Sequence, residues 1–311
     1  MIFVAGSANI DFVVRAAHIP APGETVLGRD FQTFAGGKGA NQAVASARAG
    51  AMTTHMLLAL GNDAHAAPLE QSLRSAGVCC HIVRDSVQAT GTAFICVADD
   101  ADNAITVAPG ANQSLRDSDL PPLSGFSHLL LQLETPLPTV TAYARAAREQ
   151  GVSVVLNAAP AQVLSPDVLA LIDVLIVNKG ELAVLAQHPG SIAECLARID
   201  VPCVVVTLGD RGCCARSGTS LWTEPAFAVT SVDSTGAGDT FCGVLVAALS
   251  LGNSLVQALR QASAAAALAC TRAGAQASIP THGELTHFLA AQPVATLAQI
   301  KALNRYCGFD S

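Results

Sequence analysis

The sequence predicts an α/β protein in which helices flank a central, mostly parallel sheet, with a smaller β-sheet beside it. From residue 53 onward, short apolar runs alternate with segments of helical periodicity, which is typical of a parallel sheet covered on both faces. β-like pieces interrupt this alternation and indicate the separate small sheet. We therefore expect one three-layer domain over residues 1–311, with the small sheet inserted as a lid.

Composition favours a globular protein that binds a small molecule. The 311 residues are 51% hydrophobic and 13% charged, which leaves ample material for a core. The net charge is -7 and 4% of the residues are aromatic, so the chain offers no basic stripe or aromatic platform for nucleic acid. We expect a small-molecule substrate and no nucleic-acid partner.

The cysteines and the first residues bear on the cellular compartment. The ten cysteines are scattered, and their close pairs, 79–80 and 213–214, lack the C-x-x-C spacing of zinc or redox sites. Met1 leads directly into an apolar strand without a basic leader, and no segment reaches about 18 uninterrupted apolar residues. We expect reduced thiols in a cytoplasmic protein that does not enter a membrane.

The alternating part of the chain supplies the main sheet and its helices. Apolar runs predict strands at 2–5, 53–60, 79–83, 127–131, 152–156, 174–177 and 203–207. Helical patterns occupy 38–49, 64–76, 137–150, 180–187, 192–199, 241–251 and 254–271, and an amphipathic segment at 294–306 predicts a terminal helix.

Two paired β-rich regions predict the lid, over about 12–35 and 92–108. The pieces 12–14 and 25–34 surround a Pro- and Gly-rich turn, and 91–97 pairs with 105–108 across a turn at 99–103. A small sheet of this kind exposes strand edges, which proteins usually cover or pair. We therefore expect a homodimer joined lid to lid.

Polar residues follow the first strand at alternate positions. Asn9 and Asp11 alternate with apolar residues, so both leave the strand end on one face and could bind hydroxyl groups. An Asx turn at a strand terminus is the alternative for these two residues.

Two glycine-rich turns open helices. Residues 36–41 place glycines, Lys38 and Asn41 at a helix start, where a ligand can approach the backbone. The turn fits neither the Walker A spacing nor G-x-G-x-x-G, so a P-loop or a nicotinamide site has little support.

The second turn, residues 232–241, runs into the apolar helix expected from Phe241 and organises the rest of the chain. Its helix end is an anion site because free N–H groups and the helix dipole point back at the turn. A carboxylate there could take a proton from a hydroxyl attacking a bound phosphate, which suggests Asp239 as a general base. Alternatively, Asp239 only caps the helix.

Ligands of parallel sheets bind at the carboxyl ends of the strands, where this chain carries polar or flexible residues. The residues in these positions are Glu134, Asn157, Asn178, Glu181, Thr207 and Gly209.

Together these motifs resemble the ribokinase-like, or PfkB, family of sugar kinases over about residues 1–290. The matching segments are 6–11, 22–25, 36–43, 132–135 and 234–240, in the family's order and spacing. The resemblance implies transfer of the ATP γ-phosphate to a sugar hydroxymethyl group, most specifically O5 of D-ribose. A kinase for another sugar or a nucleoside and a non-catalytic sugar sensor are the alternatives.

The resemblance also implies residue roles. Asp239 is the implied base, and the backbone N–H groups of Ala237, Gly238 and Asp239 hold the transferring phosphate, with Gly236 as a further catalytic residue of this turn. The residues implied to bind sugar hydroxyls are Asn9, Asp11, Gly37, Lys38, Asn41 and Glu134. Asn178 and Glu181 would organise water around Mg²⁺ and ATP, while Asn157, Thr207 and Gly209 would contact nucleotide phosphates and Ser263 lies near the adenine. A K⁺ site is implied at Asp233, Thr235, Ala269, Arg272, Gly274 and Ser278.

Overall fold

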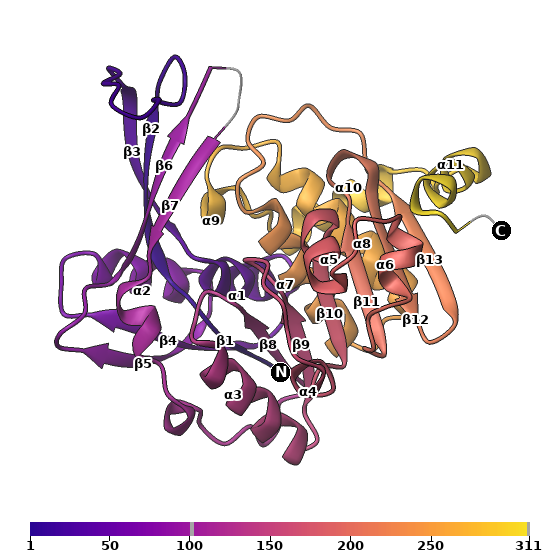
Figure 1. Cartoon of the computed structure of the whole chain (residues 1–311), viewed down its shortest axis with the longest axis horizontal. Coiled ribbons are helices and arrows are strands. Elements are labelled where there is room, and N and C mark those ends of the chain that lie inside the picture. The colour runs from indigo at the N-terminus through magenta and orange to yellow at the C-terminus, as the bar shows by residue number, and fades with distance from the viewer. Residues whose placement is uncertain (100–102, 310–311) are drawn as a thin grey trace.

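The structure is a computed structural model that describes residues 1–99 and 103–309. A nine-stranded sheet forms its centre (Figure 1). In spatial order its strands are β13 (Ser220–Pro225), β12 (Gly212–Ser217), β11 (Cys203–Thr207), β10 (Val174–Asn178), β9 (Ser153–Asn157), β8 (His128–Gln132), β1 (Ile2–Ala5), β4 (Thr54–Gly61) and β5 (Cys79–Asp85). Neighbouring strands from β11 to β5 are parallel, so the expected mostly parallel sheet is confirmed.

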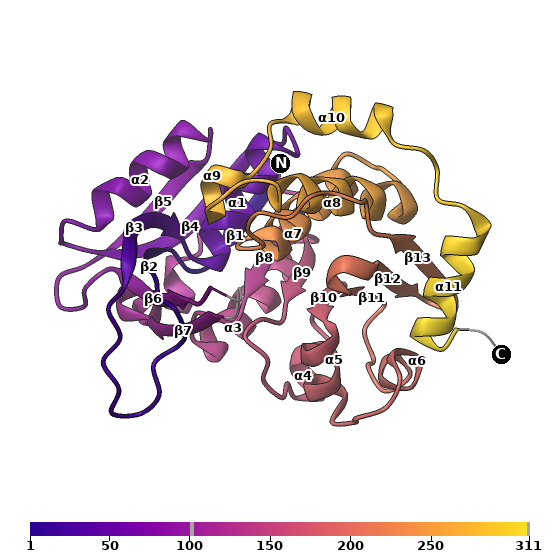
Figure 2. The ribbon, with the colours of Figure 1, turned by 90° about the horizontal axis from the view of Figure 1, so that it is seen from above.

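Helices cover both faces of this sheet and produce the three predicted layers (Figure 2). One core packs the sheet against α1 (Lys38–Arg48), α2 (Ala66–Ser75), α7 (Ala237–Ser250), α8 (Leu255–Ala269) and α10 (His282–Ala291). The opposite core packs it against α3 (Leu137–Glu149), α4 (Pro166–Leu169), α5 (Lys179–Ala186), α6 (Ile192–Leu196) and α11 (Leu297–Cys307). A short helix, α9 (Ala275–Ser278), precedes α10.

The small sheet stands beside the central one and projects from it (Figure 1). Its order is β3 (Arg29–Gly36), β2 (Asn9–Arg15), β6 (Gly91–Val97) and β7 (Asn103–Ala108). The third strand, β6, runs parallel to β2, and both outer pairs are antiparallel. Residues 100–102 of the turn predicted at 99–103 lie outside the described residues.

Several predicted boundaries are wrong. Asn9 and Asp11 do not end the first strand: the chain leaves β1 at Ala5, and both residues belong to β2 of the small sheet. The second lid strand begins at Arg29 and not at residue 25, because 25–28 connect β2 to β3 as a loop. The helix at 192 ends at Leu196, before the predicted residue 199.

Several elements are absent from the sequence prediction. The antiparallel hairpin β12–β13 extends the central sheet, α10 forms from residues with a low apolar periodicity, and the four-residue helices α4 and α9 were also missed. The hairpin strands are six residues each and meet at a turn where Gly218 has φ 56°. Such short, partly polar strands resemble loops in sequence and depend on pairing with the preformed edge at β11.

Candidate functional site

Helix α7 begins four residues before the predicted position, which moves Asp239 from the turn into the first helical turn. Gly236 has φ 73°, a conformation favoured by glycine, and this lets the chain enter the helix at Ala237. The N–H of Ala237 donates to the Ser234 carbonyl at 3.2 Å. The N–H groups of Gly238 and Asp239 have no protein acceptor among the described residues, so they point an open helix end at any ligand.

The alternative interpretation of Asp239 as a helix cap is wrong. The N-cap residue is Gly236, and no side chain of residues 1–99 or 103–309 caps this end. Asp239 is instead 9% exposed, and its two carboxylate oxygens accept hydrogen bonds from Asn41 Nδ2 at 2.9 Å and Gln42 Nε2 at 3.0 Å. These bonds orient the carboxylate and leave further lone pairs for a substrate hydroxyl.

Two buried glutamines complete this network and were missed from the sequence. Gln42 Nε2 also donates to Asn157 Oδ1 at 3.0 Å, and Gln132 Nε2 donates to Gln42 Oε1 at 2.7 Å. Gln42 follows Asn41 in the glycine-rich turn, and Gln132 directly follows the strand predicted at 127–131, so both positions were usable signals. The chain of amides ties the β8 and β9 strand ends to Asp239.

The start of α1 lies next to this network but is filled by the protein itself. Gly37 has φ 89°, and a Cβ there would lie 2.7 Å from the backbone of Ala8. The N–H of Lys38 donates to Glu134 Oε2 at 3.1 Å, and Ser7 Oγ donates to the same oxygen at 2.5 Å. Glu134 therefore occupies this helix end as an internal anion.

The two predicted hydroxyl-binding residues of β2 have different surroundings. Asn9 Oδ1 accepts from Asn112 Nδ2 at 2.7 Å, and Asn112 Oδ1 accepts from the Ala8 N–H at 3.0 Å. Asn9 and Asp11 are both paired with β3 inside strand β2, so neither of them makes the alternative Asx turn. Asp11 is 8% exposed and lies against Gly36, where a Cβ would meet its carboxylate. Burial, and then the charges of Glu134 and Asp239, raise the pKa of Asp11 to about 7.

Asn41 and Lys38 provide a polar and a cationic group at the same place. The Oδ1 atom of Asn41 is buried and has no hydrogen-bond partner among the described residues, so it can accept from a ligand hydroxyl. The negative charge of Asp239, followed by that of Glu134, raises the pKa of Lys38 despite its burial. The ammonium group is therefore charged beside the carboxylates.

Two cavities meet at the α7 start. A cavity of about 170 Å³ is lined by Lys38, Asn157, Asn178, Glu181, Thr207 and Asp239, among others. A larger cavity of about 540 Å³ is lined by Gly209, Phe227, Ala237, Phe241, Ser263 and Ala267, among others. Thr207 and Gly238 line both, so the open helix end joins a small polar space to a larger, more apolar one. This shape suits a phosphate chain with an attached ring.

Asn178 and Glu181 form the N-terminal capping box of α5. Asn178 Oδ1 accepts from the Glu181 N–H at 2.8 Å, and Glu181 Oε2 accepts from the Asn178 N–H at 2.7 Å. Both side chains nevertheless line the small cavity, and burial raises the pKa of Glu181. The carboxylate and amide oxygens suit a hard cation such as Mg²⁺, held directly or through water.

The residues predicted for a monovalent cation come together only in part. Asp233 Oδ1 accepts from the Thr235 N–H and Oδ2 from the Gly274 N–H, both at 2.9 Å, beside the α7 start. Burial acts to raise the pKa of Asp233, but these hydrogen bonds outweigh it and hold the pKa below its usual value. The other predicted residues have partners of their own. The Arg272 side chain pairs with Glu284, and Ser278 Oγ donates to the Ala275 carbonyl. The backbone carbonyl of Ala269 accepts from the Arg272 N–H.

Comparison with known families identifies this constellation. The pfkB family carbohydrate kinase pattern matches residues 1–282. The chain belongs to this family. The match ends at the first residue of α10, so nearly all of α10 and the whole of α11 lie beyond it.

Individual kinases of the family are similar along most of their length. Ribokinase of Haemophilus influenzae is 40% identical over 300 residues, which cover 92% of this chain and 97% of that protein. Ribokinase of Bacillus subtilis is 35% identical over 93% of this chain and 99% of its own. The structure of Arabidopsis thaliana ribokinase complexed with ribose and ATP has a TM-score of 0.86 and 30% identity, covering 94% of this chain and 99% of that one.

No helix within residues 1–99 and 103–309 combines the length and apolar character that a membrane span requires.

Proposed function

We propose that this pfkB-family kinase transfers the γ-phosphate of ATP to the O5 hydroxyl of D-ribose. The observation that carries the proposal is the position of Asp239, a buried carboxylate in the first turn of a helix whose N-terminus opens into the two joined cavities. The similarity to several ribokinases, one of them described with ribose and ATP, supports the choice of substrates.

In the proposed reaction Asp239 accepts the O5 proton as O5 attacks the γ-phosphorus and ADP leaves. The amides of Asn41 and Gln42 hold the carboxylate in place for this proton transfer. The free N–H groups of Gly238 and Asp239 would donate to the negatively charged oxygens of the transferring phosphate. The N–H of Ala237 would divide its hydrogen bond between this phosphate and the Ser234 carbonyl. Phosphoryl transfer needs alignment and charge stabilisation more than covalent help, and the α7 start supplies both.

The sugar is proposed to bind between β2, the α1 start and Glu134. Asp11 offers a carboxylate to the secondary hydroxyls, and Asn41 Oδ1 is an acceptor without a protein donor among the described residues. Asn9, Gly37 and Glu134 shape the same wall. Lys38 lines the small cavity with Asp239, so its charge would act mainly on the phosphate groups.

For the nucleotide, we propose phosphates in the small cavity and the adenosine part in the larger one. Thr207 lies where these spaces join, and Gly209 and Ser263 line the larger one. Asn178 and Glu181 would hold Mg²⁺ or its water ligands, which would neutralise charge on the phosphates when the ion is bound.

We also propose a K⁺ site at Asp233, Thr235 and Gly274, with backbone oxygens of the 269–278 segment completing it. An ion there would order the adjoining α7 start. Activity should be higher in potassium than in sodium salts, measured after removal of ammonium and potassium. Equal rates in the two salts would contradict this assignment.

The small sheet is proposed to act as the lid and as a homodimer surface in a cytoplasmic enzyme. Phe31 and Phe94 are exposed by 64% and 54%, although both stack on Phe12, and Ile105 and Val107 are exposed as well. Such apolar side chains on a sheet with free edges favour pairing with a second copy. Light scattering at micromolar concentration should give twice the chain mass of 31.7 kDa, and a monomer would contradict the proposal.

A coupled ADP-release assay with D-ribose, 2-deoxy-D-ribose, D-fructose and a nucleoside tests the function. A site that binds each hydroxyl leaves a buried group unpaired when a hydroxyl is missing, at about 1–3 kcal/mol. Ribose should therefore exceed 2-deoxyribose by roughly tenfold or more in kcat/KM. Preference for another acceptor would replace ribose as the substrate, and no ADP release with any acceptor would indicate a sugar sensor.

A further inference from the structure

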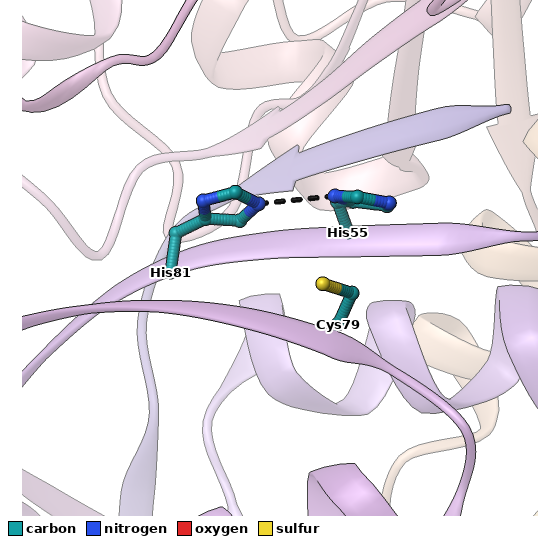
Figure 3. Close-up of side chains that lie close together, drawn as sticks. All are labelled: His55, Cys79 and His81. Atoms are coloured by element: carbon teal, nitrogen blue, oxygen red, sulfur yellow. Dashed lines mark hydrogen bonds between the residues drawn. The ribbon is translucent and has the colours of Figure 1, made fainter.

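A second cluster of chemically reactive side chains lies on the central sheet, away from the kinase site. His55 on β4 and Cys79 and His81 on β5 offer three ligand atoms that all lie within 4.8 Å of one another (Figure 3). Within residues 1–99 and 103–309 this is the only such group of three histidine, cysteine or acidic side chains. None of the three residues lines either cavity of the kinase site.

Sheet geometry explains why the three side chains meet. His55 and Cys79 are direct partners in the parallel β4–β5 register, and His81 lies two residues beyond Cys79. Because side chains alternate along a strand, Cys79 and His81 point to the same face, and Cys80 between them points to the other. The site is thus built on two hydrogen-bonded strands, which hold ligands more firmly than loops do.

The imidazoles are already brought together. His55 Nδ1 and His81 Nε2 are 3.0 Å apart, in a hydrogen bond, and the Cys79 thiol lies below the two rings in the view of Figure 3. The His55 ring packs edge-on against Phe126 with centroids 5.0 Å apart, and Phe3 lies 5.4 Å from the His81 ring. These aromatic contacts form a wall behind the rings, while Cys79 is exposed and leaves a side open to solvent.

We propose that His55, Cys79 and His81 form a binding site for a borderline-soft divalent transition metal ion of the Zn²⁺ class, with water as the fourth ligand. Two imidazole nitrogens and one thiolate suit such an ion, whereas Mg²⁺ and Ca²⁺ require oxygen ligands. Metal–nitrogen bonds of about 2.0–2.1 Å in a tetrahedron separate two nitrogens by about 3.3 Å. The ion would therefore replace the hydrogen bond with only a slight widening of the imidazole pair.

The site would join the edge strand β5 to β4 at the N-terminal ends of the two strands. The kinase site gathers at the opposite, carboxyl ends of the strands. An ion here would thus stabilise the sheet edge without entering the phosphoryl transfer. This proposal does not depend on the proposed sugar substrate.

Cobalt(II) titration of the reduced, metal-free full chain, followed by absorption spectroscopy, tests the site. One equivalent should produce the visible bands of tetrahedral Co²⁺ and a thiolate-to-cobalt charge-transfer band. Cys79→Ser should abolish the charge-transfer band, and His81→Asn should lower affinity at least tenfold. Cys80→Ser is the matched control, because this neighbouring thiol faces the other side of the strand and bonds to the Val78 carbonyl. It should bind cobalt like the parent chain.

Zn²⁺ should displace the cobalt and, at about 100-fold above its Kd, raise the Tm by roughly 5 °C. The proposal is overturned if the charge-transfer band persists in Cys79→Ser, if neither His81→Asn nor His55→Asn weakens binding, or if less than a fifth of an equivalent binds. Far-ultraviolet circular dichroism establishes that each variant is folded. Should His55→Asn unfold, the loss of cobalt binding is judged from His81→Asn alone.

Discussion

Helices α1 and α7 both begin at a glycine with positive φ and have no side-chain cap, yet their N-termini have opposite fates. The α1 end is packed and carries its own anion: Glu134 accepts the Lys38 N–H, and a Cβ on Gly39 would lie 2.7 Å from the Ser7 backbone. The α7 end is open, since a Cβ on Gly238 would meet no atom of the described part of the chain within 4 Å. A helix N-terminus can therefore hold a ligand anion only where the fold leaves it unfilled.

Replacing the proposed base at the open end should have the largest effect. Asp239→Asn keeps the shape and the contact to Gln42 but removes the proton acceptor, so kcat should fall by roughly 10²-fold or more. The KM for ribose should stay within a few-fold. Near-normal turnover in steady-state kinetics would remove Asp239 as the base and, with it, the functional difference between the two helix ends.

A pair of glycine substitutions separates packing from ligand access. Gly238→Ala should fold normally, because the methyl group enters open space, but should lower kcat/KM for ATP by about tenfold through the loss of about 1.4 kcal/mol of phosphate contact. Gly39→Ala should instead lower the Tm by several degrees, from overpacking of about 1–3 kcal/mol. Calorimetry and kinetics on both variants check this, and a reversed pattern would contradict the comparison.

The pH dependence should reveal Asp11 beside the α1 start. With a pKa of about 7, its ionised fraction rises about tenfold from pH 6 to pH 8, so the KM for ribose should fall by up to that factor if the carboxylate accepts sugar hydroxyls. Asp11→Asn is the control and should abolish this dependence. A parent KM that does not change with pH would argue against hydroxyl binding by Asp11.

The raised pKa of Asp11 also makes the free energy of unfolding depend on pH. The native Asp11 binds its proton more tightly than the unfolded chain, whose carboxyl has a pKa of 3.8. Between about pH 4 and pH 7 the native state therefore holds more protons, and the Asp11 contribution to the free energy of unfolding falls as pH rises, then stays level above that range. Denaturant unfolding of the ligand-free protein and of Asp11→Asn measures the difference.

The smallest expected effect lies at α11, outside the family match. Tyr306 accepts a hydrogen bond from Lys179 Nζ at 3.2 Å, and the Arg211 guanidinium lies 4.4 Å from its ring centroid. Arg211 ends the short turn Gly209–Arg211, which borders the larger cavity. Tyr306→Ala should raise the KM for ATP two- to threefold, by about 0.5 kcal/mol, without changing that for ribose.

Tyr306→Phe retains the ring over Arg211 and loses only the hydroxyl, so its KM for ATP should stay near the parent value. Unchanged kinetics in Tyr306→Ala would show that α11, which lies beyond the family match, does not influence ATP binding.

Local patterns were sufficient for the fold class, and they also picked out several residues that the structure brings together at the α7 start. Alternating apolar strands and helical segments predicted the parallel sheet, because each reflects a backbone periodicity written in neighbouring residues. The motifs around Asn41 and Asp239 were found for the same reason, and the structure places their side chains in hydrogen-bonding contact although 198 positions separate them.

The tertiary structure alone decided which of these groups are filled, paired or free. Gln132 joins the Asp239 network from a strand end, and the cysteine spacing concealed the proposed metal site because its third ligand, His55, comes from the adjacent strand. The two glycine-rich helix starts look alike in sequence, but Glu134 reaches only one of them. Distances between residues far apart in the chain depend on strand order and packing, which no local pattern specifies.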